Sequence, residues 1–160
     1  MKRWRHLITL TSCFLSGCGF HLSTANSLPQ PLHSLVVKST DSRFGSQLKS
    51  TLSGMGFSID TSSRCALKIT SYVATSSLPT VVLAGQPTTA TQSALASVSL
   101  VCDKKTIAAR SFTASQEITL SNTALTSSKP SSELIFSFNR DIIQQIYLWM
   151  QSKVIASQFK

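Results

Sequence analysis

The 160-residue sequence lacks most patterns that mark an enzyme or a metal protein. Its six acidic residues are scattered, and it has neither the Gly-x-Ser-x-Gly motif of serine hydrolases nor a glycine-rich phosphate loop. None of its three histidines has an available Cys, Asp or Glu at a convincing metal-ligand spacing. The thiol near His21 does not count, because Cys18 is expected to carry lipid. We therefore expect a protein that is not an enzyme and binds neither a metal nor a cofactor.

Acidic side chains are also few relative to basic ones, with six Asp and Glu against fifteen Lys and Arg. The basic residues are dispersed rather than clustered, which argues against nucleic acid as a partner. Residues 18–160 keep twelve basic and all six acidic residues, an excess of six positive charges. This excess suits an acidic partner such as lipid phosphates, although a basic surface can also serve solubility alone.

The N-terminus has no apolar run long enough to cross a membrane. Its apolar stretch, from Leu7 to about Leu15, is preceded by three basic residues, whereas a spanning helix needs roughly 20 apolar residues. A basic start, a short apolar stretch and small residues before a cleavage site are typical of a bacterial export signal. Residues 1–17 are therefore predicted to be a signal peptide.

The cleavage site resembles that of a bacterial lipoprotein. Leu15-Ser16-Gly17-Cys18 matches the lipobox at every position, so Cys18 is predicted to carry acyl chains that anchor the mature chain in a membrane. Cys13 is the competing thiol, but it follows the bulkier Thr11 and would leave a very short apolar region. Gly19 stands where inner-membrane lipoproteins commonly have Asp, which favours the outer membrane.

Two further cysteines, Cys65 and Cys102, lie in the region that follows. Cys65 opens one predicted strand and Cys102 closes another, and these two ends meet if the strands pair antiparallel. An exported protein folds in an oxidising compartment, where a disulfide is permitted. The spacing favours a Cys65–Cys102 disulfide over two independently buried thiols.

Residues 18–32 are predicted to be a lipidated, polar tether, and residues 33–160 a single domain. We expect an α+β fold in which a four-stranded sheet carries two helices on one face, in the order βαβββα. Strands are expected at 33–39, 65–74, 92–102 and 106–120, helices at 41–56 and 133–155, and a short extended piece at 57–60. Asp103-Lys104-Lys105 is expected to form a tight polar turn between the last two strands.

Periodicity also predicts which side chains face the core. The first helix has a face made of Phe44, Leu48, Leu52 and Met55, and either Asp41 or Ser42 can cap it. The second helix has a stripe that could line a ligand groove, although a core face is favoured: Ile135, Phe138, Ile142, Ile146 and Trp149, widened by Leu134, Ile143, Tyr147, Met150 and Val154.

Two of the predicted strands alternate clearly. In residues 65–74, Leu67, Ile69 and Ser71 are expected on one side, with Lys68, Thr70 and Tyr72 on the other. In residues 92–102 the side chains expected on one side are Ala94, Ala96, Val98, Leu100 and Cys102.

The first residues after the predicted cleavage site, Cys18-Gly19-Phe20-His21-Leu22, resemble the start of the LPS-assembly lipoprotein LptE family. The segment "QLKSTLSGMGFSI" (47–59) is similar to the helix of that family that ends in Leu-x-x-x-Gly before an apolar strand. Ala84-Gly85-Gln86 is similar to its Gly-Gln hairpin turn. The order of elements is similar over nearly the whole mature chain.

The resemblance implies a protein that plugs the outer-membrane LPS-translocating barrel, LptD, helps that barrel assemble and contacts lipid A phosphates. Lys129 lies near a basic position of the family before the last helix and is the candidate LPS contact, the alternative being a solvated loop lysine. Leu83 departs from the basic residue that the family often has before its turn glycine. Rival functions are a free-standing lipid-binding or transporter-auxiliary lipoprotein and a lipid-anchored hydrolase, which the missing motifs disfavour.

Overall fold

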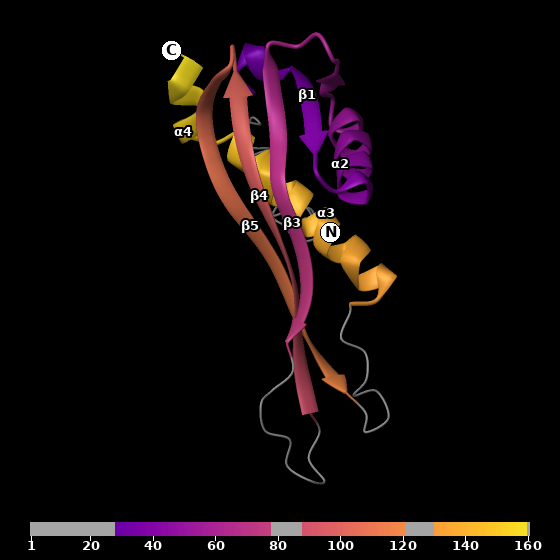
Figure 1. The fold of residues 1–160 in the computed structure, drawn as a ribbon. Coiled ribbons are helices and arrows are strands. Elements are labelled where there is room, and N and C mark those ends of the chain that lie inside the picture. Colours follow the sequence, from indigo (N-terminus) through magenta and orange to yellow (C-terminus); the bar gives the residue numbers. More distant parts are fainter. Residues whose placement is uncertain (1–27, 78–87, 121–129, 160) are drawn as a thin grey trace, which may run out of the picture.

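A computed structural model describes residues 28–77, 88–120 and 130–159 of the chain (Figure 1). The sheet is built of β1 (Ser34–Ser39), β2 (Ser58–Ile59), β3 (Cys65–Ser77), β4 (Thr88–Cys102) and β5 (Lys105–Leu120). The helices are α2 (Ser42–Gly54), α3 (Ser132–Met150) and α4 (Lys153–Ala156), with short 3-10 turns η2 (Gln30–Leu32) and η3 (Ser157–Phe159).

The sheet has five strands in the order β2-β1-β3-β4-β5. β1 runs parallel to both β2 and β3, whereas β3, β4 and β5 form an antiparallel meander. The predicted α+β class is confirmed, but the predicted number of four strands is wrong. The fifth strand is β2, which lies within the short extended piece predicted at 57–60 and was not counted as a strand. Its two residues pair with Ser34 and Leu35 and are too few to show any alternation in the sequence.

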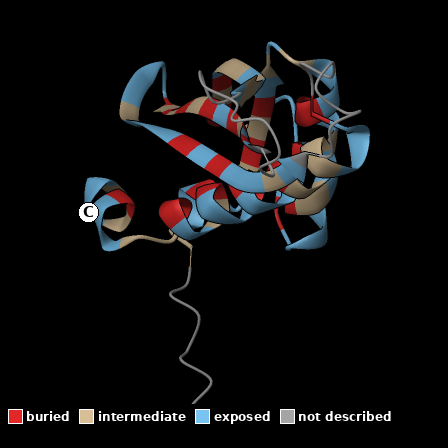
Figure 2. Cartoon of the chain, turned by 90° about the horizontal axis from the view of Figure 1, so that it is seen from below, coloured by how far each residue is buried: buried red, intermediate tan, exposed pale blue. Residues whose placement is uncertain are grey.

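The two long helices lie on one face of the sheet. α2 contacts β1 and β2, α3 contacts β4 and β5, and the helices also contact each other. In Figure 1, α3 crosses behind the long strands, so the opposite face of these strands is turned to the viewer. Buried positions gather between the sheet and the helices (Figure 2), which places the core in this single layer.

The first helix begins and ends on local signals. The Asp41 side chain caps it by accepting a hydrogen bond of 2.7 Å from the backbone N–H of Phe44. Phe44 is fully buried, as are Leu48 and Leu52, whereas Met55 is 39% exposed and does not belong to the predicted apolar face. The reason is that the helix ends at Gly54, so Met55 lies in the cap that follows it.

The second predicted helix is divided in two. α3 ends at Met150, and the extended backbone of Ser152 (φ −65°, ψ 150°) separates it from α4. Because of this break the 3.6-residue period does not continue, and Val154, predicted to widen the stripe, is 67% exposed. The turn instead buries Ile155 completely. Along α3 itself the favoured core face is confirmed at these buried positions: Phe138, Ile142, Ile143, Ile146, Trp149 and Met150.

The alternation predicted for β4 is confirmed, since all five of its expected inward residues are buried. In β3 the alternation holds only as far as Ile69. The register with β4 shifts between Ile69 and Ser71, so Thr70 is an extra residue in a β-bulge. The bulge moves the following side chains to the opposite face. Tyr72 therefore points toward the helices, as Leu67 does, and the side predicted for it is wrong.

The packed part of the chain includes η2, which falls within the predicted tether of residues 18–32. Leu32 has no exposed surface and belongs to the core cluster, and its backbone N–H donates to Pro29 O at 2.8 Å. Among the residues that the structure describes, none of the helices combines the length and the apolar character needed to cross a membrane.

A partly buried chain of polar side chains connects the two helices to the sheet. Tyr72 Oη donates to Asn139 Oδ1 at 2.5 Å, and Asn139 Nδ2 donates to Gln47 Oε1 at 2.8 Å. Asn139 is only 5% exposed, and the Tyr72 ring stacks on Phe44 with 4.7 Å between ring centroids. Burial raises the pKa of the Tyr72 hydroxyl, and the charge of Asp41 adds to the shift. One asparagine thus links β3, α2 and α3.

Replacing Tyr72 with Phe is expected to lower the free energy of unfolding by about 1–2 kcal/mol, because Asn139 Oδ1 loses its donor in a buried site. Tyr147→Phe is the matched control, since no hydrogen bond of the Tyr147 hydroxyl is seen within the described residues. It should change the free energy by less than about 0.5 kcal/mol. Urea unfolding of both variants measures the difference, and equal losses would contradict the role of the polar chain.

Candidate functional site

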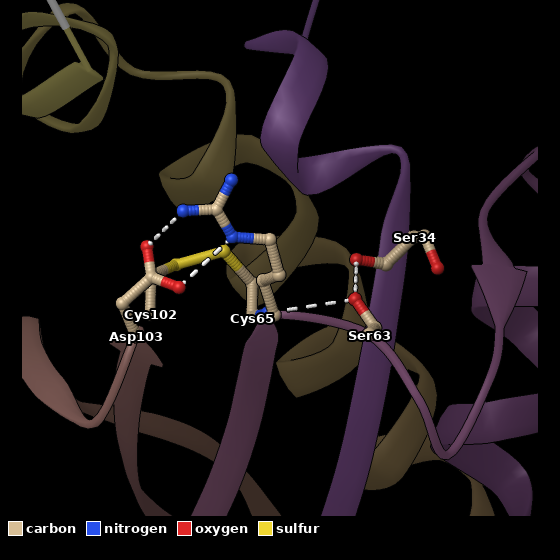
Figure 3. The surroundings of a disulfide bond; sticks show 6 residues. Ser34, Ser63, Cys65, Cys102 and Asp103 are labelled. Atoms are coloured by element: carbon tan, nitrogen blue, oxygen red, sulfur yellow. Dashed lines mark hydrogen bonds and ion pairs between the residues drawn. A yellow bond between two sulfur atoms is a disulfide. The ribbon is translucent and has the colours of Figure 1, made fainter.

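A disulfide closes the end of the β3–β4 pair (Figure 3). Cys65 and Cys102, the pair predicted from the sequence, are direct partners in the antiparallel register, and their sulfur atoms are 2.06 Å apart. Their Cα atoms are 4.1 Å apart, a separation typical of pairs that do not exchange backbone hydrogen bonds. Both side chains are buried, so the bond lies at the edge of the core.

An ion pair flanks the disulfide. Arg64 donates from Nε to Asp103 Oδ1 and from one terminal nitrogen to Oδ2, both at 2.9 Å. The hydrogen bonds from Arg64 lower the pKa of Asp103 and raise the pKa of Arg64. Because both side chains are exposed, the pair mainly orients the strand ends and adds little stability. We did not predict this pair, although the sequence carried a signal for it: each partner adjoins one of the two cysteines.

The hairpin turn explains why Asp103 reaches back to Arg64. Asp103 and Lys104 have φ of +51° and +67°, as in the type I′ turn that suits a two-residue hairpin loop. The predicted tight polar turn is therefore confirmed, and Lys105 is already the first residue of β5. Asp103 also donates its backbone N–H to Arg64 O at 3.0 Å, so backbone and side chain join the same two residues.

A shallow pocket of about 530 Å³ lies over this end of the sheet, between the disulfide, the loop that precedes β3, η2 and Phe159. In the loop, Ser63 Oγ donates to Ser34 O at 2.5 Å and accepts from Cys65 N at 3.4 Å (Figure 3). A hydrogen bond from the Ser62 hydroxyl lowers the pKa of Asp60. These polar groups of the loop therefore already have hydrogen-bond partners within the protein. The pocket is the outer surface of this end of the sheet, which the disulfide and the loop contacts hold together.

The described part of the chain contains few of the predicted site residues. Cys18 and Lys129 lie outside it, as do the signal peptide, Leu83 and the turn at residues 84–86. Within residues 28–77, 88–120 and 130–159, no three His, Cys, Asp or Glu side chains come together in an arrangement that could hold a metal ion. The predicted site residues that the structure brings together are therefore the two disulfide cysteines.

The broadest feature is the sheet face opposite α2 and α3, which we call the uncovered face. Its side chains come from alternate positions of neighbouring strands and are mostly hydroxyls, for example Ser97 opposite Ser111 and Thr75 opposite Ser93. The hydroxyl oxygens are 3.1 Å apart in the first pair and 3.2 Å apart in the second. A small apolar spot lies among them, formed by two side chains that face each other across β3 and β4 and are 48% and 39% exposed: Val73 and Leu95.

Comparisons with known proteins identify structures of similar fold but no family for this chain. Neither a known family profile nor a curated protein matches the sequence. Solved structures do match. A crystal structure of a minor lipoprotein from Acinetobacter baumannii aligns with a TM-score of 0.53 at 15% identity, covering 79% of this chain and 95% of that one.

A second match is the solution structure of an uncharacterized lipoprotein B from Nitrosomonas europaea. It aligns with a TM-score of 0.60 at 12% identity, covering 78% of this chain and 84% of that one. At these identities the likeness concerns the fold, which is thus one that occurs in bacterial lipoproteins.

Replacing both Cys65 and Cys102 with Ala is expected to lower the free energy of unfolding by about 4 kcal/mol, because the bond links residues 37 positions apart and restricts the unfolded chain. Urea unfolding with and without a reducing agent measures the effect. The reductant should destabilise the native protein and leave the variant unchanged. Mass spectrometry after alkylation without reduction gives the direct check: two alkylatable thiols at these positions in the mature protein would contradict the disulfide.

Proposed function

We propose that this protein is an outer-membrane lipoprotein, anchored through Cys18, that plugs and helps assemble the LPS-translocating β-barrel and assists the insertion of LPS at the cell surface. The observation that carries the proposal is the segment Cys18-Gly19-Phe20-His21-Leu22, which combines a lipidation site with a likeness to the start of the LptE family. No catalytic step is part of this function, so the protein acts through its surfaces.

The lipid anchor is supported from two sides. The lipobox, the basic start and the short apolar stretch coincide at the N-terminus, each at the position that export and lipidation require. The two proteins of similar fold are themselves lipoproteins by description. Stable anchoring in a membrane needs more than one acyl chain, and a lipoprotein N-terminus carries several.

The uncovered face supports a barrel as the partner. The lumen of a large outer-membrane barrel is polar, since each strand alternates apolar residues that face the lipid with polar residues that face the lumen. Beyond the β-bulge the uncovered face consists mostly of Ser and Thr hydroxyls, with one apolar spot at Val73 and Leu95 and one acid at Glu117. Such a surface can contact a polar wall through hydrogen bonds between neutral groups, and its small side chains let the partner approach closely. The opposite face is already occupied by α2 and α3.

Substituting Cys18 with Ala is expected to abolish acylation, leave the precursor uncleaved at Gly17–Cys18, and remove the mature form from the outer-membrane fraction. Cys13→Ala is the matched control, because it removes a neighbouring thiol of the same segment and should leave processing and localisation unchanged. Membrane fractionation and intact-mass measurement test both variants. A Cys18→Ala protein that keeps its acyl chains, or a Cys13→Ala protein that loses them, would contradict the assignment.

Affinity purification of the full lipoprotein from detergent-solubilised envelopes is expected to recover a large β-barrel protein at near-equal stoichiometry. Such a complex follows from a plug, which must fit one barrel. Recovery of the lipoprotein alone, in detergents that preserve other envelope complexes, would contradict the plug and favour a free-standing lipid-binding lipoprotein. A Lys129→Gln variant in the same experiment separates the two roles of the protein, since it should keep the barrel and lose LPS that co-purifies.

A further inference from the structure

Two lysines lie side by side on the uncovered face, on the other side of the bulge from the hydroxyl-rich part. Lys38 of β1 and Lys68 of β3 are direct partners in the parallel register. Their chain neighbours Val37 and Leu67, also direct partners, are 5% and 0% exposed on the helix side. Because successive side chains of a strand alternate between faces, both lysines must point away from the helices.

The strand register places these two lysines directly opposite each other on neighbouring strands. Neighbouring strands are roughly 4.8 Å apart, so two like charges on partner residues repel each other. Within the described residues neither lysine has an acidic side chain within 4.0 Å. The ion pair found there at this distance is the one between Arg64 and Asp103. Among the described strands Glu117 is the only acid, and it pairs with Thr91 toward the far end of the sheet. The charge of the two lysines is therefore uncompensated.

A hollow with hydroxyl groups adjoins the lysines. Ser99 of β4 is the direct partner of Lys68, so Lys38, Lys68 and Ser99 form one row across three strands, which we call the lysine row. The β-bulge lies beside the row, and there Thr70 Oγ1 donates to Ser97 O at 3.2 Å. A shallow pocket of about 430 Å³ opens next to the row, on the side of β4 and β5; it shares Ser99 with the row, and neither lysine lines it. Four hydroxyl residues line this pocket: Thr70, Ser97, Ser99 and Ser111.

From this geometry we propose that the lysine row and the adjoining hollow bind a phosphoryl group. Two ammonium groups supply six donors and two positive charges, and a serine hydroxyl adds a further donor, which suits the three or four oxygens of a phosphate. Binding also removes the repulsion between the lysines. The proposed site uses other residues than the predicted contact at Lys129, and it does not depend on a barrel partner. A lipid headgroup and free phosphate share this chemistry.

The test uses the full mature lipoprotein in neutral detergent micelles. K38Q/K68Q removes both charges and keeps most of each side chain. K49Q/K153Q is the matched control, because it removes two exposed lysines of α2 and α4 and reaches the same net charge. One arm adds inorganic phosphate against chloride at equal ionic strength. The other adds phosphatidylglycerol to the micelles against zwitterionic phosphatidylcholine.

Native protein and control should show a higher Tm in at least one arm, and K38Q/K68Q should bind the same probe about tenfold more weakly or worse. A response to inorganic phosphate, with or without one to phosphatidylglycerol, supports a site for the phosphoryl group itself, and a response to phosphatidylglycerol alone identifies a headgroup. Without either probe, K38Q/K68Q should melt no earlier than the native protein, since it relieves the repulsion. No response in either arm, or an equal response in K38Q/K68Q, would overturn the site.

Discussion

The register of β3 against β4 is the constraint on which the rest of the structure depends. Side chains alternate along a strand, so a slip of one residue would turn every inward side chain of one strand to solvent. The bond between Cys65 and Cys102 joins the first residue of β3 to the last residue of β4 and excludes such a slip. The ion pair beside it is a consequence, because Arg64 and Asp103 adjoin the two cysteines.

The β-bulge at Thr70 divides the sheet into two parts with different tasks. Before it, the register set at the disulfide directs Leu67 and Ile69 into the core and Lys68 outward. After it, the changed alternation turns Tyr72 inward, where the tyrosine hydroxyl reaches Asn139 and so connects both helices to the strand. Without the extra residue this hydroxyl would lie on the uncovered face, and the Asn139 carbonyl oxygen would lose its donor in a buried site.

The features that followed from the sequence are those with a regular period or a local signal. Alternation predicted β4, a helical period and a capping residue predicted α2, and the turn at Asp103 followed from its position between two strands. β2 lies within the short extended piece predicted at 57–60, although its pairing with β1 was not predicted. Two features had no such signal. The extra residue in β3 is an ordinary Thr70, and the break at Ser152 interrupts an apolar period that the sequence itself continues. Each is decided by tertiary packing, since the break buries Ile155 and the bulge supplies a donor to Asn139.

The two faces of the sheet explain how one small domain can serve contacts on its outside. The large apolar side chains of the core come from the helix-facing positions, so the outward positions are free of this packing requirement and mostly hold small hydroxyl residues. On such a surface a charge is not needed for packing, and two like charges on neighbouring strands repel each other. Two like charges on partner residues of neighbouring strands, with no acidic partner within 4.0 Å among the described residues, suit a ligand or partner of opposite charge. Because the polar groups of the loop at the disulfide pocket already have partners, the uncovered face is favoured over that pocket as the surface through which this protein acts.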